Sequence, residues 1–202
     1  MSALPEPYLT GLTEEEYLAI EREATYRSEY IDGDMYAMAG ASEVHATIIS
    51  NVVAGLHAQF KGRLCRVYGT DMRVRVADSG LYTYPDVLAL CGGPRLLDDR
   101  GDTLLNPQLI VEVLSPGTAF YDRTEKFRRY RQISSFTDYV LIWQHKLRVE
   151  HWQPAPEGGE WSGKDYFLPE EILRFPGLDA ALSLADIYDK VSFSSLLLTP
   201  QR

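Results

Sequence analysis

Leu109-Ile110-Val111-Glu112-Val113-Leu114 is the stretch that decides the fold, because five aliphatic residues surround a single glutamate. An apolar run of this length, rich in β-branched residues, predicts a strand that is buried on both faces of a sheet. The upstream stretch Tyr84-Pro85-Asp86-Val87-Leu88-Ala89-Leu90 has the same character, with Asp86 as its only charged residue. Together with the helical segments around them, these strands indicate an α/β fold.

The two acidic residues occupy positions where burying a charge is energetically unfavourable. An unpaired carboxylate in a strand buried on both faces would cost on the order of several kcal/mol, even after relaxation. Glu112 should therefore be protonated, ion-paired or bound to a metal ion. If the two strands are neighbours in the sheet, the carboxylates of Asp86 and Glu112 can meet.

Two carboxylates on a rigid sheet form a hard, oxygen-rich site that suits Mg²⁺ or Mn²⁺. Such a site suits phosphodiester hydrolysis, because the ion would orient the scissile phosphate, acidify the attacking water and stabilise charge on the leaving oxygen. The helix expected after this strand would fold back over the sheet. Asp122, Lys126 and Tyr130 share one face of that helix, so Lys126 could supply a cation near the nucleophile.

The residues alone leave a structural role equally open. Asp86 and Glu112 could each be held by an arginine, such as Arg73 or Arg75 on the neighbouring strand. A carboxylate paired in this way would need no metal ion. The residues by themselves do not favour either interpretation.

Three further side chains have plainer interpretations. Lys126 could be a surface lysine paired with Asp122, an interaction worth about 0.3 to 0.5 kcal/mol. His45 lies near the start of a helix and fits a half-buried core histidine better than a ligand, so we treat it as an auxiliary site residue. Glu29 could reach the site from a hairpin, but a solvated pairing with an arginine is favoured, and Glu29 is not in the candidate set.

The remaining segments alternate between helical and strand patterns. Thr13 and Glu16 form a Thr-x-x-Glu capping box that predicts a helix, and Asp32-Gly33 between apolar residues predicts a hairpin. Ser42 begins a second helix that extends to about Lys61. We also expect strands at 65–76, 82–90, 109–114, 139–143 and 147–152, with a turn at 78–80. A helix should extend from Ser115-Pro116 to about Ile133, and a loop should follow at 154–163. Near the C-terminus, we expect Leu196-Leu197-Leu198 to pack onto the domain or onto a second subunit.

Length and composition fit one globular domain. The chain has 202 residues, of which 45% are apolar and 24% charged, enough to bury a core. We expect a single domain over residues 1–202, with a core at about 30–152 and a C-terminal extension at 153–202. Cys65 and Cys91 match no paired metal spacing and are too few for a disulfide framework. With no export signal or membrane span visible, a reduced cytoplasmic protein is expected.

The net charge of −9 opposes the coating of nucleic acid by bulk electrostatics, since phosphate binding depends on lysine and arginine. The positive charges are unevenly distributed, however. Nine residues hold five of them: Arg123, Lys126, Arg128, Arg129 and Arg131. We therefore expect a local basic patch on an acidic protein.

Pro85-Asp86 followed by Glu112-Val113-Leu114 resembles the signature of PD-(D/E)xK nucleases. The wider frame resembles one bacterial family of that superfamily, named for putative restriction endonucleases, and the resemblance covers nearly the whole chain. The matching segments are Tyr30-Ile31-Asp32-Gly33, Ala37-Met38-Ala39-Gly40-Ala41-Ser42, Tyr84-Pro85-Asp86-Val87, Val111-Glu112-Val113-Leu114-Ser115-Pro116, and Tyr121-Asp122-Arg123 through Lys126.

The resemblance implies a restriction-endonuclease-like fold, a central mixed β-sheet flanked by helices with an N-terminal helix and hairpin. It also implies a Mg²⁺ or Mn²⁺ ion held by Asp86, Glu112 and the carbonyl of Val113. The superfamily expects lysine two residues after Glu112, where this chain has Leu114, and in this branch Lys126 takes that role. The implied substrate is DNA, and a homodimer is expected because relatives often pair to address both strands.

Two functions follow as hypotheses. The first is a Mg²⁺-dependent DNA endonuclease that uses Asp86, Glu112 and Lys126. The second is a catalytically silent nuclease-fold module for binding or assembly, which the acidic composition would suit.

Overall fold

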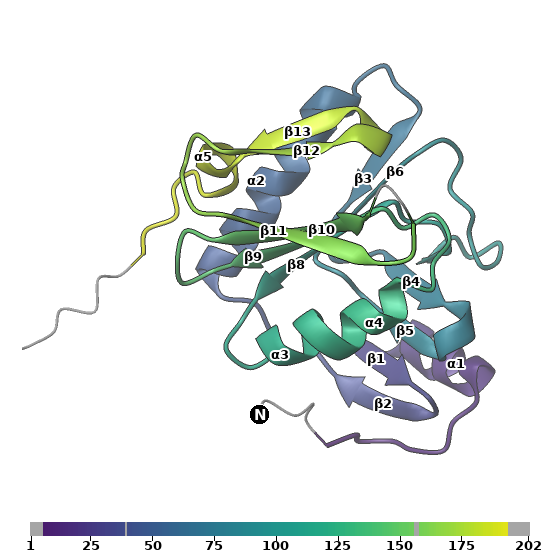
Figure 1. Cartoon of the computed structure of the whole chain (residues 1–202). Coiled ribbons are helices and arrows are strands. Elements are labelled where there is room, and N and C mark those ends of the chain that lie inside the picture. The colour runs from purple at the N-terminus through teal and green to yellow at the C-terminus, as the bar shows by residue number, and fades with distance from the viewer. Residues whose placement is uncertain (1–5, 39, 156–157, 194–202) are drawn as a thin grey trace, which may run out of the picture.

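The computed structural model describes residues 6–38, 40–155 and 158–193. It contains two mixed β-sheets and a separate two-stranded ribbon, with helices between and against them (Figure 1). None of the helices in these ranges combines the length and hydrophobicity that a membrane span requires. The expected packing of Leu196-Leu197-Leu198 lies outside the described residues.

The first two helices begin where their capping residues predict. The Thr13 side chain accepts from the N–H of Glu16 at 3.2 Å, and the Glu16 carboxylate accepts from the N–H of Thr13 at 2.8 Å. Ser42 caps the second helix by accepting from the N–H of His45. The helices are α1 (Glu14–Glu23), α2 (Glu43–Phe60), α3 (Ala119–Tyr121), α4 (Phe127–Tyr130) and α5 (Leu184–Ile187), and a π-helical turn (Asp122–Lys126) joins α3 to α4.

The hairpin is also confirmed. Asp32 and Gly33 both have positive φ, at 51° and 104°, as a two-residue hairpin turn of this kind requires. One sheet has the strand order β2-β1-β5-β4-β7 and the other β11-β10-β9-β8-β6-β3, each with one parallel pair. The strands are β1 (Ser28–Ile31), β2 (Asp34–Ala37), β3 (Cys65–Tyr68), β4 (Arg73–Val76), β5 (Leu81–Thr83), β6 (Val87–Cys91), β7 (Thr103–Leu104), β8 (Leu109–Leu114), β9 (Asp138–Trp143), β10 (Val149–Pro154), β11 (Trp161–Tyr166), β12 (Ile172–Phe175) and β13 (Ala180–Ser183).

Two of the expected strands are each broken into two. Residues 65–76 form β3 and β4, and residues 82–90 contribute to β5 and β6. The break before β6 falls at Pro85, which has no N–H to offer to a strand partner. β4 pairs with β5 in the smaller sheet and β3 pairs with β6 in the larger one, so a single bent hairpin belongs to both sheets.

The larger sheet separates two hydrophobic cores. Alternate residues of β8 point to opposite faces: Val111 packs in the core beneath α2, whereas Ile110 packs in the core beneath the helix of residues 119–130. That second core also takes residues from the smaller sheet, so the helix lies between the two sheets (Figure 1). Glu112 shares the face of Ile110, and the fold therefore directs it toward Lys126.

The chain after residue 160 contributes to the core. β11 adds a strand to the larger sheet, and it begins at Trp161, inside the stretch 154–163 that was expected to be a loop. β12 and β13 pair as a ribbon beside α2 (Figure 1). Leu173, Leu182 and Leu184 are buried against the α2 side chains. This segment shields the face of the sheet opposite the helix of residues 119–130.

The two cysteines differ from the expectation. Cys65 and Cys91 lie directly opposite each other on β3 and β6, and they form a disulfide. Their number gave no sign of this bond, because only the pairing of the two strands brings them together. The expected reduced state of these two cysteines is therefore wrong for this structure.

Candidate active site

Asp86 and Glu112 occupy facing positions at the end of a strand pair. β6 and β8 are antiparallel with Val87 opposite Val111, so the next pair in that register is Asp86 and Glu112. The Asp86 carboxylate accepts a hydrogen bond from the N–H of Val113 at 2.7 Å. The sequence-based inference that the two carboxylates come from neighbouring strands is thus confirmed.

Lys126 reaches Glu112 from the helix above the sheet. Its Nζ atom lies 2.8 Å from Glu29, 3.2 Å from Glu112 and 3.5 Å from Asp122, and only 5% of the residue is exposed. The hydroxyl of Tyr130, one turn further along the helix, donates to Glu112 at 2.9 Å. The alternative of an ordinary surface lysine is wrong, because Lys126 is buried among three carboxylates.

Two acids of this cluster were missed from the sequence. Glu29 lies on β1, where all four residues are buried, and it accepts a hydrogen bond from Thr83 besides its ion pair with Lys126. The predicted solvated arginine pairing of Glu29 is wrong. A signal was present, since a lone acid in a buried strand is the same anomaly that Glu112 displays. Asp122 was predicted to share a helix face with Lys126 and was considered as its surface partner; the two do pair, but Asp122 is buried because the helix lies between two sheets (Figure 1).

His45 contacts the site directly. It lies in the first turn of α2, and its Nε2 atom is 2.9 Å from Asp86 Oδ1. Its side chain is largely buried, as predicted, but the ring binds a carboxylate instead of packing only against apolar neighbours. His45 therefore fixes the orientation of Asp86 from one side while the N–H of Val113 fixes it from the other.

The arginines suggested as structural partners lie elsewhere. Arg73 donates to the Tyr84 hydroxyl at 3.0 Å and lies 3.0 Å from Asp102, while Arg75 binds Glu14 at 2.9 Å. Neither guanidinium holds one of the two site carboxylates. The arginine-paired alternative is therefore wrong.

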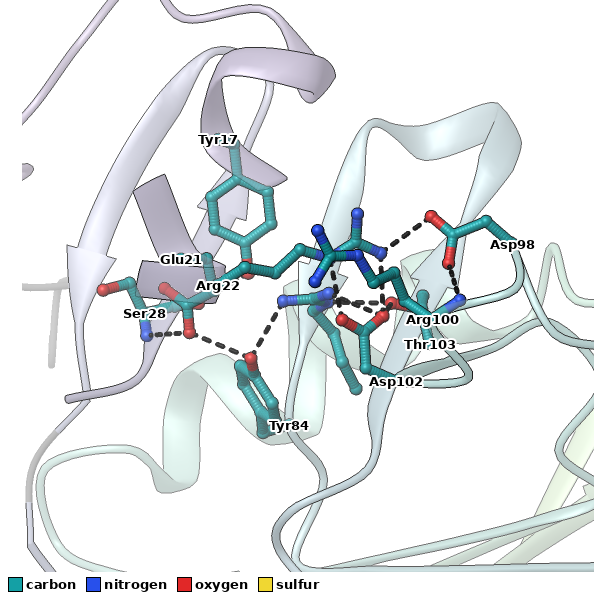
Figure 2. Close-up of polar contacts among 10 residues, drawn as sticks. Tyr17, Glu21, Arg22, Ser28, Tyr84, Asp98, Arg100, Asp102 and Thr103 are labelled. Atoms are coloured by element: carbon teal, nitrogen blue, oxygen red, sulfur yellow. Dashed lines mark hydrogen bonds and ion pairs between the residues drawn. The ribbon is translucent and has the colours of Figure 1, made fainter. Parts of the chain in front are cut away.

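The contacts of Arg73 with Tyr84 and Asp102 belong to a second polar network, which reaches the pocket at Tyr84 (Figure 2). Tyr84 donates to Glu21 at 2.9 Å, and Glu21 accepts from the N–H of Ser28 at 3.0 Å. Arg22 binds Asp102 on the other side of the network, at 2.8 Å. Because Tyr84 directly precedes Pro85-Asp86, this network anchors the chain as it enters the site.

The cluster holds more negative charge than its surroundings can tolerate. Three carboxylates, on Glu29, Glu112 and Asp122, lie within 3.5 Å of the Lys126 ammonium, and Asp86 adds a fourth negative charge close to Glu112. Full ionisation of the four acids against this one ammonium would leave three negative charges in excess. Burial, together with the neighbouring carboxylates and against the pull of Lys126, raises the pKa of Glu112 to about 8. The pKa of Asp122 is likewise raised by burial. Burial opposes the charge on Lys126, but Glu112 and Glu29 outweigh it and raise the pKa of Lys126 well above its ordinary value.

The cluster forms one wall of a pocket of about 660 Å³. This volume is in the range of ligand-binding pockets. Residues from β1, β2, the start of α2 and the helix of residues 119–130 converge on it. Besides the cluster, its lining includes Tyr26, Arg27, Tyr36, Ser42, Thr70, Val113 and Tyr121.

Residues 14–186 match the family model Uma2, described as "Putative restriction endonuclease". This chain belongs to the Uma2 family. The Uma2 match spans the pocket and every residue of the acidic cluster, and it confirms the resemblance seen in the sequence.

Two cyanobacterial proteins are similar to this Uma2 chain. One is the uncharacterized protein sll1609 of Synechocystis sp. (strain ATCC 27184 / PCC 6803 / Kazusa), 39% identical over 142 residues, covering 70% of this chain and 80% of that protein. The other is the uncharacterized protein slr1290 of the same strain, 32% identical over 185 residues, covering 90% and 94%. A crystal structure described as a putative nuclease belonging to DUF820, from Anabaena variabilis ATCC 29413, superposes with a TM-score of 0.72 at 20% identity, covering 90% of this chain and 99% of that one. The likeness confirms the expected nuclease-type α/β fold for this Uma2 protein.

The donor set of the Uma2 pocket fits a hard divalent cation. Among the described residues, no group of three or more His, Cys, Asp or Glu side chains is arranged to hold a metal ion, which leaves no candidate for a zinc-type site. Mg²⁺ needs fewer protein ligands, because it binds one or two carboxylates and keeps several water molecules. Glu112 uses one oxygen, Oε1, for both Tyr130 and Lys126, and within the described chain its other oxygen accepts no hydrogen bond.

The expected basic patch is not a free cationic surface. Arg123 binds Glu150, Arg128 binds Glu125, and Arg129 binds both Asp32 and Glu125. Lys126 is buried in the acidic cluster. The prediction is therefore wrong in its main point, because four of the five basic residues are already paired within the chain.

Proposed function

We propose that this Uma2 protein is a Mg²⁺- or Mn²⁺-dependent phosphodiester hydrolase that cleaves DNA. The observation that carries the proposal is the buried excess of carboxylates in an open pocket. A cluster of four acids and one lysine is costly to bury, and a divalent cation would remove most of that cost. The family name and the nuclease-type fold support the same function.

In this proposal, Asp86, Glu112 and the carbonyl of Val113 hold the metal ion. When bound, the ion would polarise the scissile phosphate, acidify the attacking water and stabilise charge on the leaving oxygen. His45 and the N–H of Val113 keep the Asp86 carboxylate in place, and Tyr130 does the same for Glu112. These contacts preorganise the site before substrate arrives.

Lys126 acts as a fixed positive charge in this mechanism. Without a metal ion, the neighbouring carboxylates raise the pKa of Lys126 and keep the ammonium protonated, which favours a role other than that of general base. Held between Glu29 and Glu112, it can instead position a water molecule or stabilise negative charge on the phosphoryl group. Glu29 thereby helps to position Lys126, the helix residue that takes the role of the lysine found on the strand in the superfamily pattern.

The test is cleavage of plasmid and single-stranded DNA in the presence and absence of Mg²⁺ or Mn²⁺. We expect Asp86→Asn, Glu112→Gln and Lys126→Ala each to lose about a hundredfold or more in metal-dependent rate. Lys190→Ala, which removes an exposed lysine, is the matched control and should retain full activity. Since Lys126 is buried, Lys126→Ala should also lower stability by about 3 to 5 kcal/mol, so folding is verified by circular dichroism first. Unchanged cleavage in all three variants would refute the assignment.

A non-catalytic nuclease-fold module is the second candidate, and one observation favours it. Both oxygens of Asp86 are already bonded within the chain, to His45 and to the N–H of Val113. Calorimetry with Mg²⁺ or Mn²⁺ separates the two candidates. Binding that is abolished by Glu112→Gln, tightens as pH rises toward 8 and releases protons supports the enzyme, because the ion must displace the proton of Glu112. No binding at millimolar metal supports the module.

A further inference from the structure

Tyr121 carries a buried hydroxyl with no partner. Only 7% of the residue is exposed, and its hydroxyl is one of three buried side-chain polar atoms that lack a hydrogen bond in the described chain. The other two belong to Glu21 and Arg73, and neither residue lines the pocket. Tyr121 does line it, so its hydroxyl is the unsatisfied buried donor at the site.

The neighbouring tyrosines show that a buried hydroxyl without a hydrogen-bond partner is exceptional in this part of the structure. Tyr130 donates to Glu112, Tyr139 donates to the carbonyl of Asp122, and Tyr84 donates to Glu21, each at 2.9 Å. Burying a hydroxyl without a partner is unfavourable, and native structures rarely do so without a functional reason. A phenylalanine at position 121 would avoid the cost.

The helix geometry brings Tyr121 beside Lys126. Residues five apart lie on different faces of a regular α-helix, which has 3.6 residues per turn. The π-helical turn of residues 122–126 widens this part of the helix and brings both side chains to the pocket, with Nζ of Lys126 5.7 Å from the centre of the Tyr121 ring. Such turns occur frequently at functional sites.

The chemistry of the hydroxyl defines what it can bind. Burial, with a further contribution from Glu29, raises the pKa of Tyr121 above its ordinary value, so the group stays protonated and donates. It donates to none of the carboxylates around it. A donor next to an ammonium, in a pocket suited to a divalent cation, is complementary to an anionic oxygen of the substrate.

We propose that the Tyr121 hydroxyl donates a hydrogen bond to a non-bridging oxygen of the substrate phosphate, on the side next to Lys126. This inference rests on the proposed function and makes Tyr121 a catalytic residue that contacts the substrate. A hydrogen bond to a charged phosphate replaces the missing partner, so the cost of burial is relieved only when substrate is bound. In the unliganded protein, the unpaired hydroxyl of Tyr121 lowers stability.

The test compares Tyr121→Phe with Tyr188→Phe, the matched control, whose buried hydroxyl donates to the Arg148 carbonyl at 2.8 Å and does not line the pocket. Without ligand, we expect Tyr121→Phe to keep or raise Tm, because it removes an unsatisfied group, whereas Tyr188→Phe lowers Tm by removing the hydrogen bond to the Arg148 carbonyl. In the metal-dependent cleavage assay, Tyr121→Phe should lower kcat by about tenfold to a hundredfold, the loss of one hydrogen bond to a charged group. Tyr188→Phe should cleave at close to the wild-type rate.

A binding measurement separates this inference from the proposed function. Thymidine 5′-monophosphate, titrated in the presence of Mn²⁺, should bind Tyr121→Phe about tenfold more weakly than wild type. If Asp86→Asn and Glu112→Gln keep full cleavage activity, the proposed function fails, and the nucleotide titration still tests Tyr121. A fall in Tm for Tyr121→Phe, or unchanged nucleotide affinity, would overturn the inference.

Discussion

At the scale of single residues, the site is governed by the balance between Glu112 and the charges around it. Glu112 is 4% exposed and its carboxylate lies 3.2 Å from the Lys126 ammonium, yet Glu29 and Asp122 share that ammonium and Asp86 adds a further negative charge nearby. One positive charge cannot satisfy four negative ones in a medium that screens poorly. The folded protein therefore retains a proton on Glu112 at pH values where the unfolded chain has lost it.

The raised pKa makes stability depend on pH in a defined direction. Glu112 titrates near pH 4.5 in the unfolded chain and near pH 8 in the folded protein, so the folded state binds the extra proton between these values. Stability should therefore fall as pH rises through this window in the absence of metal. Glu112→Gln removes the titration, and we expect it to raise the free energy of unfolding at pH 8 by about 1 to 3 kcal/mol.

Thermal melts from pH 5 to pH 8 in a chelating buffer check this expectation. The gain from Glu112→Gln should shrink as the pH falls toward 5, because Glu112 is then protonated in the folded wild-type protein. Glu160→Gln, which changes an exposed glutamate, serves as the control and should melt as wild type does. A lower Tm for Glu112→Gln at pH 8 would contradict the account.

At the scale of elements, the helix of residues 119–130 positions the lysine, and aromatic packing positions the helix. The Phe127 ring stacks on Tyr139 with a centroid distance of 4.9 Å and packs against Trp152 at 5.4 Å and Trp161 at 5.3 Å. Trp152 in turn lies over Gly163, its partner across β10 and β11. Lys126 precedes Phe127 directly, so the position of the ammonium depends on this stack.

Gly163→Ala tests that dependence. A Cβ atom at this position would lie 2.8 Å from three ring atoms of Trp152, which cannot swing away freely because the ring is held against Phe127. We expect a loss of about 1 to 2 kcal/mol in the free energy of unfolding, measured by urea denaturation. Ser162→Ala, at the next position on β11, should change stability by less than about 0.5 kcal/mol. Equal effects of the two substitutions would show that the stack does not constrain Trp152.

At the scale of the whole molecule, the charges limit how nucleic acid can be held. The chain carries a net charge of −9, the arginines of the 123–131 segment are largely engaged in ion pairs, and the pocket is acidic. Nucleic acid bound under the proposed function must therefore depend on the metal ion, with few phosphates contacted by free lysine or arginine.

Salt dependence measures the number of such contacts. We expect the slope of log K against log[KCl] to be about −1 to −2 for a fluorescein-labelled oligonucleotide with Ca²⁺ present, compared with roughly −6 or steeper for proteins that neutralise many phosphates. Binding should disappear in a chelating buffer. A steep slope, or tight binding without metal, would indicate a cationic surface that engages DNA independently of the acidic cluster.

The sequence determined much of the framework. Local signals specified the first helix, the hairpin at Asp32-Gly33 and the second helix, because caps and turns act over a few residues. The acids in apolar runs identified Asp86 and Glu112, since a buried charge is costly wherever the strand is placed. The family resemblance pointed to Lys126 and to the nuclease-type fold.

Only the tertiary structure decided which groups surround these residues. Glu29 and Tyr121 enter the site from a hairpin and a helix that are distant in the chain, and the disulfide of Cys65 with Cys91 required the pairing of two strands. Two partners of the arginines near Lys126, Glu150 and Asp32, are distant in the chain and became visible only in the fold, whereas Glu125 stands within one helical turn of Arg128 and Arg129. Charge and hydrogen-bond compensation depend on distances in space, whereas caps, turns and apolar runs are properties of neighbouring residues.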